Sequence, residues 1–221
     1  MVIGITGNFG VGKTTVARMF RRLGARIIDA DQIAHAIIRP HTSAYRRILS
    51  CFGRNVLSGV YISRRRLAEA AFSNRKKLKK LNKIMHPEII NLIKNRIKEL
   101  SKKQIIVVDA ALLIESGLSP QQLSKQPGLK KKNLRKDILP WIDKLIVVRS
   151  ESNVQIRRLK RSGLTNDMIE KILSSQLSQD NKIGFADFVI DNSGRRNKTR
   201  KQVKEIWDKI IINRGGQRWK R

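Results

Sequence analysis

The chain has 221 residues, 40% of them hydrophobic, and its 48 Lys and Arg against 17 Asp and Glu give a formal net charge of +31. This length is enough for one substantial core, so we expect one α/β domain with helical insertions. No run approaches the roughly 18 apolar residues of a membrane span, and no signal peptide precedes the first predicted strand. We therefore expect a cytoplasmic protein without a membrane partner. The single cysteine, Cys51, excludes an internal disulfide and a cysteine-based metal cluster.

The positive charge admits two interpretations. A basic surface attracts polyanions, so nucleic-acid binding is one of them. The other is a generally basic background around an enzyme whose substrates carry phosphates. The basic residues are spread over every segment, and aromatic residues make up 5% of the chain, which leaves few platforms for base stacking. We therefore expect nucleic-acid adsorption as a side effect of the charge and not as the primary function.

The N-terminal segment combines a predicted strand, a glycine-rich loop and a predicted helix. An apolar run over residues 2–5 precedes G-N-F-G-V-G-K-T at residues 7–14, which matches G-x-x-x-x-G-K-[ST], and a helical pattern extends to residue 23. The glycines let backbone N–H groups turn around a phosphate at the positive end of the helix. We predict a purine nucleoside triphosphate as the ligand, with Lys13 on its phosphates and Thr14 on Mg²⁺. The binding residues would be Asn8, Phe9, Gly10, Val11, Gly12, Lys13, Thr14 and Thr15.

A pair of aspartates follows the second predicted strand, at residues 26–28. Asp29-Ala30-Asp31 stands at its carboxyl end, the edge at which open α/β sheets bind ligands. A kinase that phosphorylates a hydroxyl needs a carboxylate to take or orient the proton, and Asp31 lies one step further into the expected cleft. A second interpretation stays open, because either aspartate could cap the N-terminus of the following helix.

The middle of the chain predicts a helical insertion and then a central strand. Residues 32–103 are helical in pattern, with loops at 40–43 and 53–63, and His86-Pro87 predicts a helix start. Residues 105–108 are continuously apolar, as in a central parallel strand, and lead to Asp109 in the position of a Walker B carboxylate. We therefore predict Asp109 as a second metal ligand. Residues 119–136, with six basic residues, predict an exposed loop.

The last third of the chain predicts two more strands and mostly helix. The strands are at residues 145–148 and 188–190, and between them residues 153–179 are helical with a break at Ser162-Gly163. Residues 199–212 predict a closing amphipathic helix, and we expect the polar tail from residue 215 to fray.

Several strings of this sequence together resemble the dephospho-coenzyme A kinase family nearly end to end. The most specific are I-D-A-D-Q-I-A at residues 28–34 and A-D-F-V-I-D-N-S-G at 186–194. The others are I-G-I-T-G at 3–7, the phosphate loop, R-R-L-A at 65–68, His86-Pro87, V-D-A-A-L-L-I-E-S-G at 108–117, Q-I-R-R-L at 155–159 and Gln176. The resemblance implies ATP-dependent phosphorylation of the ribose 3′-hydroxyl of dephospho-coenzyme A.

The resemblance also implies an architecture. It is an α/β fold, a P-loop NTPase core in three layers around a parallel sheet, with a helical substrate-binding insertion and a lid. The core would comprise residues 1–31, 104–150 and 186–221, interrupted by the basic loop at 119–136. Residues 32–103 would form the insertion that binds the acceptor, and residues 151–185 the lid.

Individual roles follow from the same resemblance. Asp31 resembles the general base, and Arg158 and Arg161 resemble lid arginines that clamp phosphates. We expect Arg158 to face solvent in an open lid. Asn192 and Gly194 would lie near adenine, and His86 and Leu112 on the acceptor side. A hydrogen-bonded histidine at a helix start is the other interpretation of His86.

Three features depart from the family pattern. Thr14 replaces a serine but keeps the hydroxyl, so we expect function to survive. Ala111 and Ile114 replace the proline and phenylalanine of P-L-L-F-E, which bears on acceptor affinity. The basic stretch at 119–136 has no family counterpart from which to inherit a role.

Two other functions compete with this interpretation. A nucleoside monophosphate kinase would share fold, lid and magnesium chemistry, but D-A-D-x-I-A argues against it. A nucleotide-dependent nucleic-acid-binding protein is suggested by the charge, and nucleic-acid-stimulated ATP turnover would identify it.

Overall fold

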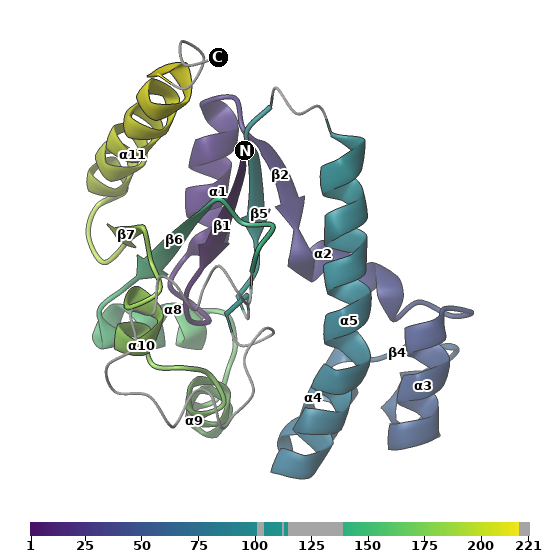
Figure 1. Cartoon of the computed structure of the whole chain (residues 1–221). Helices are drawn as coiled ribbons and strands as arrows, with labels where there is room; N and C mark the ends of the chain where they lie inside the picture. The colour runs from purple at the N-terminus through teal and green to yellow at the C-terminus, as the bar shows by residue number, and fades with distance from the viewer. Residues whose placement is uncertain (101–103, 112, 115–138, 217–221) are drawn as a thin grey trace. The chain divides into compact units, whose positions relative to one another are not determined.

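The structure is a computed structural model that describes residues 1–100, 104–111, 113–114 and 139–216 (Figure 1). The chain divides into two compact units. We call residues 1–28 together with the described part of 101–221 the sheet unit, and residues 29–100 the helical unit. No helix in the described ranges is both long and apolar enough to cross a membrane.

A five-stranded sheet forms the centre of the sheet unit. Its strands are β1 (Val2–Thr6), β2 (Arg26–Asp29), β5 (Ile106–Asp109), β6 (Lys144–Arg149) and β7 (Phe188–Asp191), in the order β2-β5-β1-β6-β7. β1 pairs in parallel with β5 and β6, and β6 pairs in parallel with β7. All five predicted strands are therefore confirmed. Their continuous apolar runs reflect burial, because β1 and β5 are buried at every position.

One face of the sheet is covered by the first and the last helix of the chain. α1 (Lys13–Arg22) and α11 (Arg196–Gly216) lie on the same side of the strands in Figure 1. Ile3 and Ile5 of β1 pack there with Phe20 of α1, which is fully buried. The rings of Phe20 and Trp207 are 6.3 Å apart. α11 is longer than predicted, since it begins at Arg196 and its backbone stays helical to Gly216.

Three helices connect β6 to β7 in the sheet unit. They are α8 (Ser152–Arg161), α9 (Asn166–Ser174) and α10 (Gln179–Ile183). The predicted break at Ser162-Gly163 is confirmed, and Gly163 has a φ of 86°. A second break before α10 was not predicted. It arises because the Ser178 side chain accepts a hydrogen bond from the Asn181 backbone N–H and starts a new helix.

The helical unit is more regular than its sequence suggests. It contains α2 (Ala30–Ile37), α3 (Ser43–Phe52), α4 (Arg64–Phe72) and α5 (Arg75–Glu99), and α5 contacts the other three. The stretch at 53–63, predicted as a loop, holds a 3₁₀ turn (Arg54–Val56) and a hairpin of β3 (Leu57–Ser58) and β4 (Tyr61–Ile62). Gly59, at the turn, has the left-handed φ of 61° that such a tight connection requires.

The predicted helix start at His86-Pro87 is wrong. α5 runs through this point without ending, with Pro87 inside the helix. Proline removes one backbone donor and strains the preceding turn, which favours a boundary. Tertiary packing outweighs this cost, because Ile84 and Ile93 are buried on either side of Pro87 against the other helices. His86 is half-buried in the helix interior.

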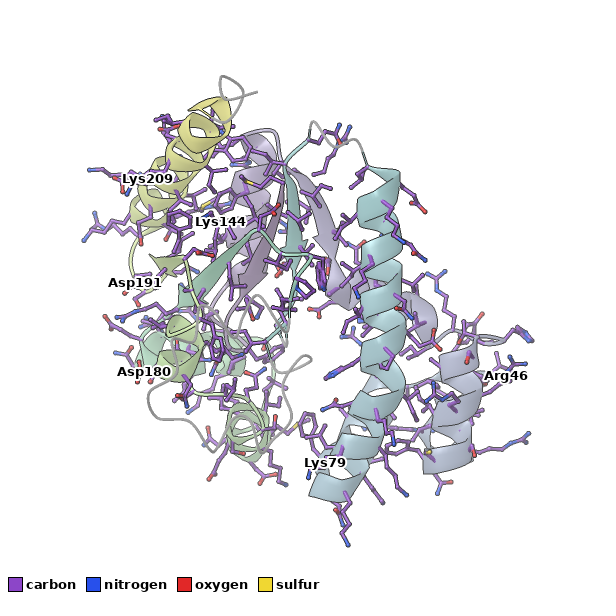
Figure 2. All side chains as sticks on the ribbon, viewed as in Figure 1. Arg46, Lys79, Lys144, Asp180, Asp191 and Lys209 are labelled. Atoms are coloured by element: carbon purple, nitrogen blue, oxygen red, sulfur yellow. The ribbon has the colours of Figure 1, made fainter. Side chains whose placement is uncertain are left out.

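Charged side chains cover both units, as Figure 2 shows for Arg46 and Lys79 on the helical unit and Lys209 on the sheet unit. Exposed basic residues occur in the helices of both units. This distribution agrees with the even spread along the sequence.

Candidate active site

The phosphate loop connects β1 to α1, and its geometry depends on Gly12. Gly12 is the N-terminal residue that precedes α1 and has a φ of 91° in the left-handed region. A Cβ at this position would lie 2.3 Å from the Asn192 side-chain nitrogen. Both the backbone conformation and the close approach therefore require glycine.

Several backbone donors of the loop have no partner in the described part of the chain. The N–H groups of Gly10, Gly12 and Thr14 donate no hydrogen bond to any residue that the structure describes. The cap residue of α1 is Gly12, which has no side chain to bond to these groups. The first turn of a helix carries a partial positive charge, so unpaired N–H groups there favour an anion. This is the local geometry of a phosphate cradle.

The carbonyl of Val11 is held from outside the loop. It accepts hydrogen bonds from Nδ2 of Asn192 at 2.8 Å and from Nη1 of Arg158 at 3.2 Å. In a trans peptide the C=O and the following N–H point in opposite directions. The N–H of Gly12 is therefore turned away from these two side chains. Asn192 is buried, and its Oδ1 accepts a hydrogen bond from the Thr199 hydroxyl at 2.9 Å.

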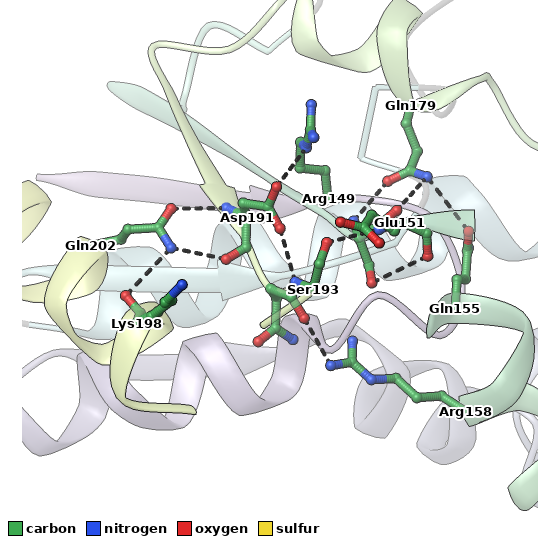
Figure 3. A network of polar contacts seen from close by, with 11 residues as sticks. Arg149, Glu151, Gln155, Arg158, Gln179, Asp191, Ser193, Lys198 and Gln202 are labelled. Atoms are coloured by element: carbon green, nitrogen blue, oxygen red, sulfur yellow. Dashed lines mark hydrogen bonds and ion pairs between the residues drawn. The ribbon is translucent and has the colours of Figure 1, made fainter. Parts of the chain in front are cut away.

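Arg158 does not face solvent, and this expectation is wrong. Arg158 is half-buried, and its Nη2 donates to the Asn192 carbonyl at 2.7 Å (Figure 3). This bond is in addition to the one from Nη1 to the Val11 carbonyl. Burial, and then the charge of Arg157, lower the pKa of Arg158, although an arginine stays protonated at neutral pH. Arg161, at the end of α8, is exposed and has no partner among the described residues.

The loop lysine lies within the protein in this structure. Lys13 is buried, and its Nζ donates to the Asn8 carbonyl at 3.1 Å. The Asn8 Oδ1 atom is also buried but has no hydrogen-bond partner in the described part of the chain. A polar cavity of about 410 Å³ adjoins Asn8, with Ser150, Gln155 and Gln179 in its wall. An unpaired buried acceptor is costly, so a donor from a ligand or water would stabilise it.

The predicted metal ligands differ in exposure. Thr14 is exposed, whereas Asp109 is buried at the end of β5. Among the described residues no group of three or more His, Cys, Asp and Glu side chains could hold a metal ion.

The two aspartates after β2 have different roles in the fold. The Asp29 carboxylate accepts hydrogen bonds from the N–H groups of Asp31 at 2.9 Å and Gln32 at 3.1 Å, so it caps α2. Of the two aspartates that could cap this helix, Asp29 is therefore the one that does so. Asp31 is exposed in the first turn of α2, and its carboxylate has no partner among the described residues.

The turn after β7 is built around Asp191. Its carboxylate accepts from the Ser193 N–H at 2.8 Å and from Nε of Arg149 at 3.1 Å (Figure 3). Burial alone would raise the pKa of Asp191, but the hydrogen bonds from Ser193 and the charge of Arg149 lower it below its ordinary value. Gly194 follows in the open, and a Cβ there would meet only Lys198 at 3.6 Å.

The predicted acceptor-side residues stay predictions. His86 lies inside α5 of the helical unit, while Leu112 and the basic stretch at 119–136 lie outside the described residues. Sequence reasoning missed Lys182, which is fully buried in α10 and donates from Nζ to the Ala111 carbonyl at 3.2 Å. One lysine among so many carries no sequence signal for burial.

Comparison with known proteins places the chain in a family. The family model described as dephospho-CoA kinase matches residues 1–125 and 125–198. The dephospho-CoA kinase of Aquifex aeolicus is 35% identical over 94% of this chain and 96% of its own length. That of Carboxydothermus hydrogenoformans is 36% identical over 94% of this chain and 93% of its own length.

Solved structures agree with the sequence comparison. A dephospho-CoA kinase from Campylobacter jejuni has a TM-score of 0.64 at 26% identity and covers 96% of this chain and 98% of its own. A shikimate kinase from Bacteroides thetaiotaomicron is 12% identical and has a TM-score of 0.53, so it shares the fold alone. The match covers 96% of this chain and 98% of the shikimate kinase. The chain belongs to the dephospho-CoA kinase family, and its function is the phosphorylation of dephospho-CoA in the final step of coenzyme A biosynthesis.

Proposed function

We propose that the chain transfers the γ-phosphoryl group of Mg²⁺-bound ATP to the ribose 3′-hydroxyl of dephospho-CoA. The observation that carries this proposal is the phosphate loop, in which the N–H groups of Gly10, Gly12 and Thr14 have no partner among the described residues at the start of α1, next to Lys13. A bound triphosphate would supply acceptors for these donors. Lys13 would leave the Asn8 carbonyl and contact the β- and γ-phosphates.

Thr14 and Asp109 are our candidates for the residues that hold Mg²⁺. The exposed hydroxyl of Thr14 would bind it directly, and the buried carboxylate of Asp109 would bind it at the end of β5. The bound ion would neutralise charge on the transferring phosphoryl group.

Asp31 is our candidate for the general base. Because Asp29 is committed to capping α2, Asp31 keeps a free, exposed carboxylate that can accept the proton of the 3′-hydroxyl. We assign acceptor binding to residues 32–103, with His86 and Leu112 as contacts.

The arginines of α8 divide into two proposed roles. Arg161, exposed and without a described partner, is free to contact the transferring phosphoryl group when the lid at 151–185 closes. Arg158 would supply positive charge from a fixed position beside the loop. Asn192 and Gly194 would border adenine, which requires the turn after β7 to accept a flat base.

The test compares acceptors and one matched pair of variants. With ATP and Mg²⁺, dephospho-CoA should be phosphorylated and shikimate and AMP should not. Asp31→Asn should lower kcat by roughly 10²-fold or more with ATP binding retained. Asp29→Asn is the matched control, because asparagine also caps helices and the same charge is lost. Equal loss of activity in both variants would contradict the assignment of Asp31.

A further inference from the structure

Two glutamines hold the backbone of the phosphate loop at Phe9. The Phe9 N–H donates to Oε1 of Gln176 at 2.9 Å, and the Phe9 carbonyl accepts from Nε2 of Gln155 at 2.6 Å. Gln155 lies in α8 and is only 3% exposed, and Gln176 follows α9. The two bonds fix the two consecutive peptide groups that flank the Phe9 Cα.

A third glutamine sets the orientation of Gln155. Gln179 accepts at Oε1 from the Ser150 N–H at 2.9 Å and donates from Nε2 to the Ser150 carbonyl at 3.0 Å (Figure 3). This double contact leaves one possible orientation of its amide. The Nε2 atom then also faces Oε1 of Gln155 at 3.5 Å. The nitrogen end of Gln155 is therefore the end that faces Phe9.

The loop needs this support because its own backbone does not fix the peptide between Phe9 and Gly10. Gly10 has a φ of 84°, and a glycine crosses between backbone regions at little cost. A flip of this peptide would replace the Gly10 N–H with the Phe9 carbonyl. The cradle would then present a negative dipole to the phosphates in place of a donor.

We propose that Gln155 and Gln176 are positioning residues for triphosphate binding, which keep the Gly10 N–H directed at the triphosphate by holding the peptide groups on both sides of Phe9. Gln179 acts through Gln155. The inference rests on the proposed binding of ATP at this loop. It assigns to α8 and to the segment between α9 and α10 an effect on triphosphate affinity that acts through the backbone of the phosphate loop, in addition to any role in covering the substrates.

The chemistry of the two contacts differs, and this makes the proposal testable. Gln176 is used as an acceptor, so Gln176→Glu keeps its function and Gln176→Leu does not. Gln155 is used as a donor, so Gln155→Glu places a carboxylate against the Phe9 carbonyl. The two Glu variants add the same charge to the same region, and they serve as matched controls for each other.

We expect Gln155→Glu to raise the KM for ATP by about 10-fold or more, while the KM for dephospho-CoA changes less than about 3-fold. Gln176→Leu should raise the KM for ATP, and Gln176→Glu should restore most of that loss. Direct titration should show weaker binding of ATP but unchanged binding of adenosine, which lacks phosphates. Melting temperatures separate these effects from loss of folded protein.

Other results would overturn the proposal. These are equal effects of the two Glu variants, a lower kcat at unchanged ATP affinity, or a parallel loss of adenosine binding. Should Gln155→Glu fail to fold, Gln179→Glu tests the same contact at a residue that is only half-buried. Its carboxylate would face Oε1 of Gln155 and would therefore favour a turned Gln155 amide, with the nitrogen away from Phe9. An unchanged ATP affinity in that variant also contradicts the proposal. If the parent protein binds ATP but does not phosphorylate dephospho-CoA, the proposed function fails. The ATP titrations of the glutamine variants then still test whether the glutamines support ATP binding.

Discussion

Arg158 joins two loops, and its replacement should cost stability as well as activity. Arg158→Met keeps most of the side-chain length but removes both hydrogen bonds, to the carbonyls of Val11 and Asn192. A hydrogen bond from a charged donor contributes about 1.5–3 kcal/mol. Val11 keeps its bond from Asn192 Nδ2, and the guanidinium is only half-buried, so we expect a net loss of about 2 kcal/mol. For a chain of this size that lowers the Tm by roughly 4–8 °C.

The matched control is Arg161→Met, in the same helix. Arg161 has no partner among the described residues, so the Tm should stay within about 1 °C of the parent. If Arg161 contacts the transferring phosphoryl group, kcat should nevertheless fall by roughly 10-fold or more. Calorimetry and initial rates on both variants decide the matter. An unchanged Tm in Arg158→Met, or equal destabilisation in both, would refute the contrast drawn from their contacts.

The turn after β7 and the basic stretch offer three further tests. Hydrogen bonds from Ser193 and the charge of Arg149 outweigh burial and lower the folded-state pKa of Asp191 below the unfolded value of about 3.9. The Asp191 carboxylate therefore stabilises the folded protein above that pH, and this contribution is lost as the pH falls through the folded-state pKa. Asp191→Asn should therefore lower the Tm at pH 7, with a difference from the parent that shrinks below about pH 4; a constant difference would argue against the charge. Gly194→Ala should leave the Tm unchanged, since its Cβ meets only Lys198, yet weaken ATP binding measurably by titration if adenine lies there; full affinity would remove the adenine assignment. Deleting residues 119–136 should keep kcat within a few-fold, lower any nucleic-acid affinity and make it less salt-dependent, by roughly 0.7–0.9 of log–log slope per lost phosphate contact. Loss of kinase activity in a folded deletion variant would instead make this stretch part of the active site.

The features that sequence predicts best are those encoded locally. The five strands and the phosphate loop follow from continuous apolar runs and from glycines at fixed offsets, and the structure contains them where expected. The cap at Asp29 was one of two local possibilities, and only the hydrogen bonds of Asp29 choose between them.

The features that were missed depend on distant partners. Pro87 is a local helix breaker, but burial of Ile84 and Ile93 along the same helix outweighs its cost. Gln155 contacts a loop residue 146 positions away in the sequence. An uncharged glutamine in a polar helix gives no periodic or charge pattern that marks such a contact, and the same holds for the bonds of Arg158 to two loops.

The central claim is that this chain phosphorylates dephospho-CoA at the ribose 3′-hydroxyl with ATP bound at the phosphate loop. The most direct measurement incubates the protein with ATP, Mg²⁺ and dephospho-CoA and identifies the product by mass and by phosphorus NMR. We predict one phosphate added at the 3′ position, one ADP formed per product, and little product with Lys13→Ala. The absence of coenzyme A from reactions with folded, ATP-binding protein, or phosphate at another position, would contradict the account.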